Sequence, residues 1–549
     1  MRILRMWRPA SRLAGFKVWP ASQVKRFAAD AAGVTSVLFA ICFTVFFAAA
    51  AIAVDYGRGV LEKHRQQTAL DAGTLAAAEK IGLPDEAEQA TQTVQTYFNA
   101  NTGNGTQGTL EDVTIDPESG DLRTAAATDM RTSLLNGLGI SSLDIGSTSR
   151  VARFAGTIEI ALVLDNSSDL AGAPLEELRT AAQRLVSLLF GSAKYSDKIS
   201  IAIVPFAGSV NVGAKYQNAS WMDWDGSKNP SVHFENLADQ NRHRVALFEA
   251  LGTSWGGCIE VRPSPHDFSD TLANAGDPGS YFEPLFAPDE PDQAGPDDLD
   301  DYPNSYLNDF GGSCQPFAPV CLVTNKKNGK CETWSTPDPT VAQKQTCKYT
   351  GGTPDTSAAG STRKGPNMHC DAQPMTPLTG DRTRIGDAID AMRAAGTANV
   401  AEGVMWGWRA LSPSEPLPEG RPYNQANNKK YMIVMARGAN WNKGLRNINK
   451  SWYSAWGFAA NNRLNPNSHT TTSLENSMDE TSRAACRGVK DSGIKVLTIG
   501  FGASDAQTRS MLKYCASGPH DAYDAETGEE LLNIFESLAR EMVQLRVAG

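Results

Sequence analysis

The stretch IEIALVLDNSSDL, residues 158–170, decides the fold. Its opening, IEIALVLD, is an almost continuous apolar run, which is typical of a strand buried on both faces of a parallel sheet. Similar runs follow in ISIAIVPFAG (199–208), YMIVMARG (431–438) and IKVLTIGFG (494–502). Segments with helical character lie among them, at 175–190, 381–395, 479–491, 506–515 and 529–545. This alternation predicts an α/β fold with a doubly wound sheet, in which ligands bind at the carboxyl ends of the strands.

Length and charge limit the number of folding units and the class of partner. A chain of 549 residues is too long for one hydrophobic core and should form roughly two to four units. The net charge of −10 argues against a nucleic-acid partner. The charge is unevenly distributed, because seven basic residues precede the first acid, Asp30. They are Arg2, Arg5, Arg8, Arg12, Lys17, Lys25 and Arg26.

The uncharged stretch of residues 31–54 predicts a transmembrane helix. Such a helix would be about 36 Å long, enough to cross a hydrocarbon core of about 30 Å. The basic tail, residues 1–30, should stay in the cytoplasm, so we expect a single-pass protein of the bacterial inner membrane with its bulk in the periplasm. A cleavable signal peptide is the alternative, because Ala51-Ile52-Ala53 resembles a cleavage site.

The cysteines agree with export to an oxidising compartment. Cys42 lies in the predicted span, and the other eight make an even number, as a disulfide framework requires. Free buried thiols are the alternative for several of them. A zinc site built on His369 and its neighbouring cysteines is disfavoured, because no C-x-x-C pair is present. The eight are Cys258, Cys314, Cys321, Cys331, Cys347, Cys370, Cys486 and Cys515.

Composition divides the exported part into three units. Residues 55–155 are expected to form a long helix and a small α+β unit, reminiscent of pilin-like proteins, which includes a short helix near 130–138. Residues 157–212 and 377–549 carry the α/β pattern. Between them, residues 213–376 form an insertion rich in Cys, Pro and Gly. Its piece 277–309 has ten carboxylates and no basic residue, and is expected to be a solvated acidic loop because its spacing matches no EF-hand.

The loop after the first strand resembles the opening of a von Willebrand factor A (VWA) domain. In that family a D-x-S-x-S motif supplies oxygen ligands to a divalent cation at the metal-ion-dependent adhesion site (MIDAS). Asp165 and Ser167 match the first two ligand positions, and Asp169 stands in place of the second Ser. The resemblance extends to GTANVAEGVMWGWRALSP (396–413) and YMIVMARGANWN (431–442).

More specifically, the chain resembles TadG-type proteins of the TadE/TadG family. The motifs are GVTSVLFA (33–40), VDYGRG (54–59), QQTALDAGTLAAA (66–78), WGGCIEVRP (255–263) and WGWRALSP (406–413). Cys486 and Cys515 belong to the same pattern and are expected to pair. The resemblance implies a non-enzymatic role in assembling, anchoring or stabilising Flp-type (tight adherence) pili. The implied partners are pilus-assembly or other envelope proteins, with no small-molecule substrate.

Two other functions stay open beside this one. The first is a surface adhesin that binds an extracellular partner through the insertion. The second and more distant one is a secreted hydrolase, because residues 252–256 match G-x-S-x-G around Ser254. That motif works only between a strand and a helix, whereas Cys258 and two prolines follow here. His266 and Asp267 lie nearby in sequence, but a catalytic triad is defined in space, and we assign no catalytic residue.

The metal site implied by the VWA resemblance is only partly retained. Ala398 stands where the family has a ligand Thr, with Thr397 one residue early, and Arg437 stands where a carboxylate is expected. A guanidinium stays charged and repels a divalent cation. We therefore expect no Mg²⁺ or Mn²⁺ cofactor, and instead a salt bridge from Arg437 to Asp165, Asp169 or both. In the alternative, Arg437 faces solvent and the two aspartates retain a weak ion.

Overall fold

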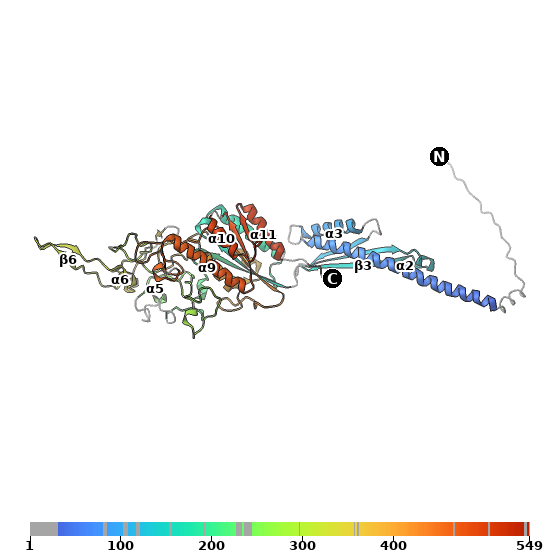
Figure 1. The fold of residues 1–549 in the computed structure, drawn as a ribbon, viewed down its shortest axis with the longest axis horizontal. Coiled ribbons are helices and arrows are strands. Elements are labelled where there is room, and N and C mark those ends of the chain that lie inside the picture. Colours follow the sequence, from blue (N-terminus) through green and yellow to red (C-terminus); the bar gives the residue numbers. More distant parts are fainter. Residues whose placement is uncertain are drawn as a thin grey trace, which may run out of the picture.

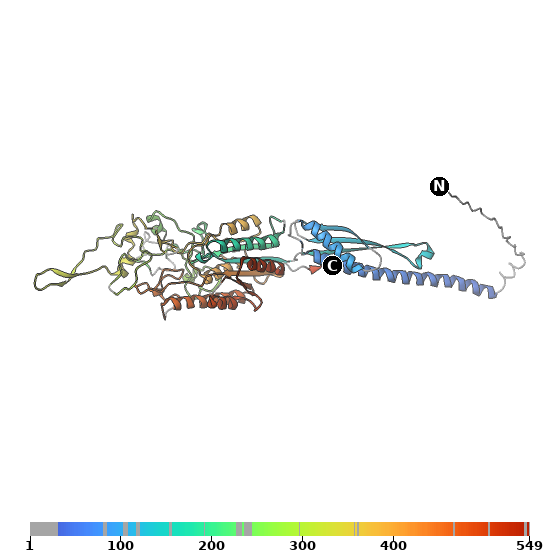
Figure 2. The same ribbon diagram turned by 90° about the horizontal axis from the view of Figure 1, so that it is seen from above.

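The molecule is elongated, with an N-terminal helix at one end and the insertion at the other (Figures 1 and 2). The computed structural model describes residues 31–549 except 79, 81–84, 103–107, 117–120, 153–155, 192, 225, 227–232, 235–243, 296, 356, 360–361, 465–466, 503–504, 543–545 and 548–549. The predicted basic tail, residues 1–30, lies outside the described residues.

A single long helix, α2 (Ala31–Ala78), contains the predicted span. Among the described residues it is the one helix whose length and composition allow it to cross a membrane, with a mean hydropathy of 2.7 in its most apolar window. The helix continues well beyond residue 54 into the next unit. Asp55, at the end of the apolar stretch, is fully buried and accepts hydrogen bonds from the main-chain N–H groups of Ser133, Leu134 and Leu135.

The small α+β unit packs against the second half of α2. It contains α3 (Glu86–Thr102), a 3-10 turn η1 (Leu135–Leu138) and the antiparallel strands β1 (Thr109–Ile115), β2 (Leu122–Arg131) and β3 (Ser142–Ala152). The short helix expected near 130–138 is therefore wrong for its first residues, because Met130 and Arg131 end strand β2 and pair with β3.

The last strand of this unit comes from the far end of the chain. Strand β14 (Arg546–Val547) pairs antiparallel with β3, opposite Ala152 and Val151. The expected α/β segment 377–549 thus ends earlier than assumed, since residues 546–547 join the small sheet. Such a short strand carries no apolar periodicity by which a sequence could reveal it.

The central domain is built on a six-stranded sheet with the order β10-β5-β4-β11-β12-β13. The strands β4 (Thr157–Asp165), β5 (Ile199–Phe206), β11 (Asn428–Ala436) and β12 (Lys495–Phe501) are the four predicted apolar runs, and they are mutually parallel. The edges are β13 (Ala522–Ala525), which is parallel to β12, and β10 (Thr376–Thr379), which is antiparallel to β5. The doubly wound α/β fold is confirmed.

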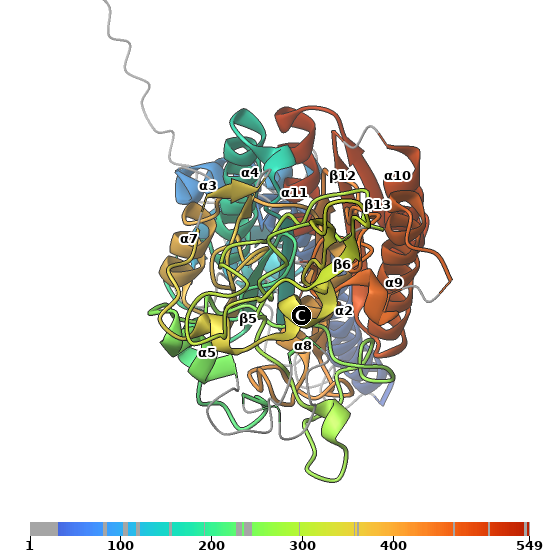
Figure 3. The ribbon, with the colours of Figure 1, turned by 90° about the vertical axis from the view of Figure 1, so that its left-hand side faces the viewer.

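Helices cover both faces of this sheet (Figure 3). One face carries α4 (Ala173–Phe190), α7 (Arg382–Asp390) and α11 (Gly528–Met542), and the other carries α8 (Val400–Leu411), α9 (Thr471–Asp491) and α10 (Ala506–Cys515). Helix α8 is buried along its whole length, so Trp406 and Trp408 are core residues. It can approach the sheet because a Cβ on Gly403 would lie 2.6 Å from Cδ1 of Phe206.

The insertion follows β5 and returns at β10, and most of it has no regular secondary structure. Its elements are short: α5 (Arg244–Ala250), β6 (Cys321–Thr324), β7 (Cys331–Trp334), α6 (Pro339–Lys344), β8 (Ala358–Ala359) and β9 (Thr362–Arg363). Further 3-10 turns of the chain are η2 (Ser168–Leu170), η3 (Ala214–Tyr216), η4 (Pro278–Ser280), η5 (Cys347–Tyr349) and η6 (Ala459–Asn461).

Disulfides hold the insertion together. The pairs are Cys258–Cys370, Cys314–Cys347 and Cys321–Cys331 within it, and Cys486–Cys515 between α9 and α10 of the central domain. These bonds occupy the thiols that a zinc site around His369 would need. Aromatic contacts join the insertion to the sheet domain, since the rings of Phe282 and Trp406 lie 5.4 Å apart.

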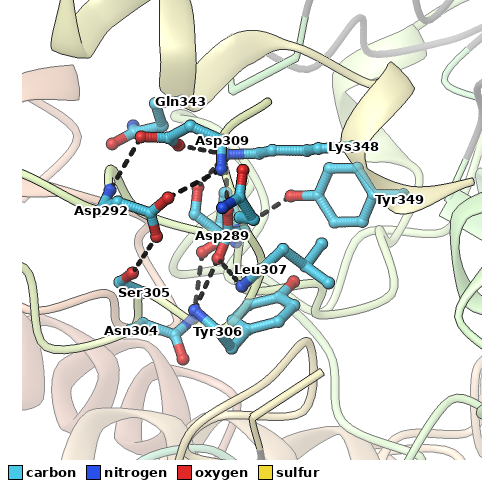
Figure 4. A network of polar contacts seen from close by, with 12 residues as sticks. Asp289, Asp292, Asn304, Ser305, Tyr306, Leu307, Asp309, Gln343, Lys348 and Tyr349 are labelled. Atoms are coloured by element: carbon cyan, nitrogen blue, oxygen red, sulfur yellow. Dashed lines mark hydrogen bonds and ion pairs between the residues drawn. The ribbon is translucent and has the colours of Figure 1, made fainter. Parts of the chain in front are cut away.

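A buried ionic cluster centres on Lys348 (Figure 4). The Lys348 ammonium lies 2.6 Å from Oδ2 of Asp289 and 3.4 Å from Oδ1 of Asp309, and all three side chains are buried. Oδ1 of Asp289 also accepts from the main-chain N–H groups of Tyr306 and Leu307. The solvated acidic loop predicted for residues 277–309 is therefore wrong at these positions, because a lysine that follows much later in the chain neutralises the carboxylates.

Candidate functional site

The MIDAS-like positions meet at the carboxyl end of β4. Asp165 is fully buried, and its carboxylate accepts hydrogen bonds from main-chain N–H groups on two strands' loops. The N–H of Ser167 lies 2.8 Å from Oδ1, and those of Arg437 and Gly438 lie 3.0 and 3.2 Å from Oδ2. Burial raises the pKa of Asp165, and the three main-chain donors oppose that rise. The carboxylate thus ties the β4 loop to the end of β11.

Asp169 and Ser167 lie beside the same turn. A Cβ added to Gly438 would overlap Oδ2 of Asp169 and would lie 3.4 Å from Oγ of Ser167. The side chain of Asp169 is exposed, whereas Ser167 is buried. The two matching positions of the first motif, Asp165 and Ser167, and the departing position, Asp169, are therefore brought together at one edge of the sheet, as the parallel strand order requires.

The second loop of the site, around residues 396–399, is closed by main-chain contacts. The carbonyl of Gly396 accepts from the N–H of Ser168, and the carbonyl of Ala398 accepts from the N–H of Trp441. Thr397 lies on the side of Gly208, where a Cβ on that glycine would be 3.1 Å from Oγ1 of Thr397. Ala398 itself has no side-chain oxygen to offer.

Arg437 does not form the expected salt bridge. Among the described residues, its guanidinium pairs with neither Asp165 nor Asp169; Nη1 donates to the carbonyl of Phe501 at 3.3 Å, and Cζ lies 5.4 Å from the centre of the Phe501 ring. The predicted salt bridge is wrong, because Arg437 donates a hydrogen bond to Asp165 through its main-chain N–H and not through its guanidinium. Its side chain turns instead to the neighbouring strand β12.

The residues present fit a divalent cation poorly. A hard cation needs several oxygen ligands aimed at one point. Both oxygens of Asp165 already accept main-chain hydrogen bonds, position 398 offers no side-chain oxygen, and position 437 carries a cation. The donor set therefore argues against a metal here, and the absence of a Mg²⁺ or Mn²⁺ cofactor stays a prediction for titration.

The end of the insertion lines the site, which sequence reasoning missed. Asn166 donates through Nδ2 to Oε1 of Gln373 and to the carbonyl of Arg393, both at 3.1 Å. A Cβ on Gly396 would overlap the carboxylate of Asp371. The disulfide from Cys370 to Cys258 fixes this segment of the insertion. The insertion begins and ends at the same sheet edge, so its two ends necessarily border the site. The position of the insertion in the chain could therefore have predicted this contact.

The surroundings of Ser254 differ from a nucleophile turn. Ser254 is exposed and follows helix α5, with no helix after it before η4. Its carbonyl accepts from Nδ2 of Asn367. His266 lies 2.8 Å from the Asp277 carboxylate, and the burial of Asp267 raises the pKa of that carboxyl. The hydrolase hypothesis depends on a serine between a strand and a helix. The residues around Ser254 do not form that arrangement.

Known proteins resemble two parts of the chain. Residues 33–80 match the Tad family, described as Flp pilus-assembly TadE/G-like. No curated protein matches the chain. The solved structures that resemble it include the vWF domain of the type V pili tip protein Mfa5 from Porphyromonas gingivalis, at 10% identity and a TM-score of 0.32, over 70% of this chain and 95% of that chain.

Two further structures are pilus adhesins. The SpaC adhesin from Lactobacillus rhamnosus GG has 11% identity and a TM-score of 0.31, over 80% of this chain and 34% of that chain. The RrgA adhesin from Streptococcus pneumoniae has 10% identity and a TM-score of 0.31, over 80% of this chain and 49% of that chain. At such low identities and TM-scores these likenesses carry no argument about this chain.

Proposed function

Because residues 33–80 match the TadE/G-like family, we propose that this chain is a non-enzymatic envelope protein that assembles, anchors or stabilises Flp-type pili. Its apolar helix holds it in the bacterial inner membrane, and the central domain and insertion lie in the periplasm. Its partners are pilus-assembly or other envelope proteins, which it contacts through the VWA-like domain. The family match in the anchor segment is the observation that carries this proposal.

The connection between the anchor and the folded part supports a positioning role. Helix α2 passes without a break from the apolar stretch into the core of the small unit. Asp55 fixes the crossing point through its hydrogen bonds to residues 133–135. A protein built in this way holds its distal domains at a set orientation to the bilayer, as a scaffold for assembly requires.

The test is deletion of the gene, with pilin level and appendages measured separately. Loss of appendages at an unchanged pilin level, restored by the full chain, is the expected result. Membrane fractionation should recover the protein in the inner membrane. Intact appendages in the deletion strain would refute the assembly role.

The adhesin alternative is supported by the position of the insertion at the end opposite the membrane helix (Figure 1). It predicts intact appendages but lost attachment in the deletion strain. Removing all of residues 213–376 would uncover the core, because Phe282 packs on Trp406. A sharper variant replaces only the hairpin Cys321–Trp334 with a Gly-Ser linker, since that hairpin projects away from the core (Figures 1 and 2).

A further inference from the structure

The hairpin of β6 and β7 forms the tip of the molecule farthest from the apolar helix (Figures 1 and 2). Its two strands pair only with each other among the described residues, so each keeps one open edge. The disulfide Cys321–Cys331 clamps the hairpin, and Cys314–Cys347 closes the loop that carries it. A two-stranded hairpin is marginal in water by itself, so the cross-links keep this shape in place.

The stem of the hairpin exposes large apolar side chains. Val320 is 63% exposed, Leu322 64%, Val323 47% and Trp334 55%. Leu322 and Val323 are consecutive residues of β6, and the register of the two strands shifts on both sides of Val323. These exposed apolar side chains lie on a cross-linked, projecting element, which marks an interaction site.

The turn of the hairpin is basic. Lys326, Lys327 and Lys330 lie between the two strands, and the hairpin carries one acid, Glu332, which accepts from Asn325. The chain as a whole carries a net charge of −10, so this local positive charge opposes the trend of the protein. An anionic partner surface would complement it.

We propose that this hairpin docks into an acidic, apolar groove on a protein partner. A groove fits because the hairpin projects (Figure 1) with two open strand edges and exposed apolar side chains, which a flat surface would cover only in part. A bilayer fits less well, since the lysine-bearing turn would enter the apolar core first. The apolar stem supplies the contact area, and the lysines orient the partner. The proposal does not depend on the pilus role.

The test uses the full chain in its native cells, with a photo-crosslinking residue in the hairpin. Leu322→p-benzoylphenylalanine is compared with Leu272→p-benzoylphenylalanine, because Leu272 is 46% exposed and lies outside the hairpin. We expect a discrete protein adduct from position 322 alone. Combining it with Lys326→Glu, Lys327→Glu and Lys330→Glu should lower the adduct yield roughly tenfold, as loss of charge complementarity predicts. Unchanged resistance to protease would show that the triple variant is folded.

Each other result overturns the proposal. No adduct above the Leu272 control would mean that the hairpin has no partner, and an adduct with the mass of two chains would mean self-association. A yield unaffected by charge reversal would remove the acidic groove. Binding of the purified chain to vesicles of phosphatidylglycerol and phosphatidylethanolamine, lost in the triple variant, would identify a lipid surface instead. Because the experiment measures a cross-linked adduct and not appendages, a failure of this proposal is distinguishable from a failure of the proposed role in pilus assembly.

Discussion

Replacing Lys348 with methionine tests whether the buried ionic cluster holds the insertion together. Lys348 is fully buried between the carboxylates of Asp289 and Asp309 (Figure 4). Lys348→Met keeps most of the side-chain volume but leaves both carboxylates without their cation. Breaking a buried pair by removing one partner costs about 3–5 kcal/mol. We expect the insertion to be destabilised by that amount at pH 8.

The effect should depend on pH in a defined direction. Burial raises the pKa of Asp289 from 3.8 to about 6, although Lys348 opposes the rise. A carboxyl group whose pKa is higher in the folded state stabilises the fold at low pH and loses that contribution as the pH rises through the folded value. Removing Lys348 raises this pKa further. The variant should therefore be weakest above pH 7 and recover as the pH falls toward 5.

Hydrogen exchange on the full chain in detergent micelles provides the local readout. The amides of Tyr306 and Leu307 donate to Asp289, so they report directly on the cluster. A loss of about 3 kcal/mol should accelerate their exchange by roughly a hundredfold or more, since 1.4 kcal/mol corresponds to tenfold. The double variant Lys348→Met with Asp289→Asn should regain part of the protection.

The matched control is Lys364→Met. Lys364 lies 3.4 Å from Asp355 in a partly exposed pair, and such a pair contributes about 0–1 kcal/mol. Equal effects of the two substitutions would refute the reasoning. So would an effect of Lys348→Met that does not weaken as the pH is lowered.

Three further predictions concern the central domain. Calorimetric titration of the full chain with Mg²⁺ or Mn²⁺ should show no saturable micromolar binding; such binding, abolished by Asp165→Ala, would contradict the donor-set argument. Gly403→Ala should lower the free energy of unfolding by about 1–3 kcal/mol, because its Cβ would meet Phe206 at 2.6 Å. The control is Gly146→Ala, whose Cβ would meet nothing within 4 Å and should leave the free energy of unfolding unchanged. Chemical denaturation measures both. Joint Cys486→Ser and Cys515→Ser substitution opens a cross-link spanning 29 residues and should cost about 3 kcal/mol by calorimetry, with an unchanged melting temperature counting against it.

The strands of the central domain were predictable because each one is apolar on both faces. Four buried runs identified β4, β5, β11 and β12 to within about three residues at either end. The edge strands β10 and β13 were not predicted. Edge strands bury less surface, so TPLT (376–379) and AYDA (522–525) lack the continuous apolar pattern.

The candidate site was predictable in its location but not in its contacts. The parallel strand order brings Asp165, Ser167 and Gly438 together, and a sequence can indicate that order. It cannot indicate that Arg437 contributes its main-chain N–H while its side chain turns to Phe501. Likewise, a count of carboxylates in 277–309 gave no sign that Lys348 lies among them, since burial of a charge depends on partners far away in sequence.

The pairing of β14 with β3 affects how the molecule carries mechanical force. The central domain leaves the small sheet after β3 and returns to it at β14, so two covalent connections join them instead of one. A pull on the distal tip is shared between both connections, and both converge on neighbouring strands that contact helix α2. Two attachment points also resist rotation about the long axis, which a single connection would permit. Synthesis must therefore reach residues 546–547 before both connections can form.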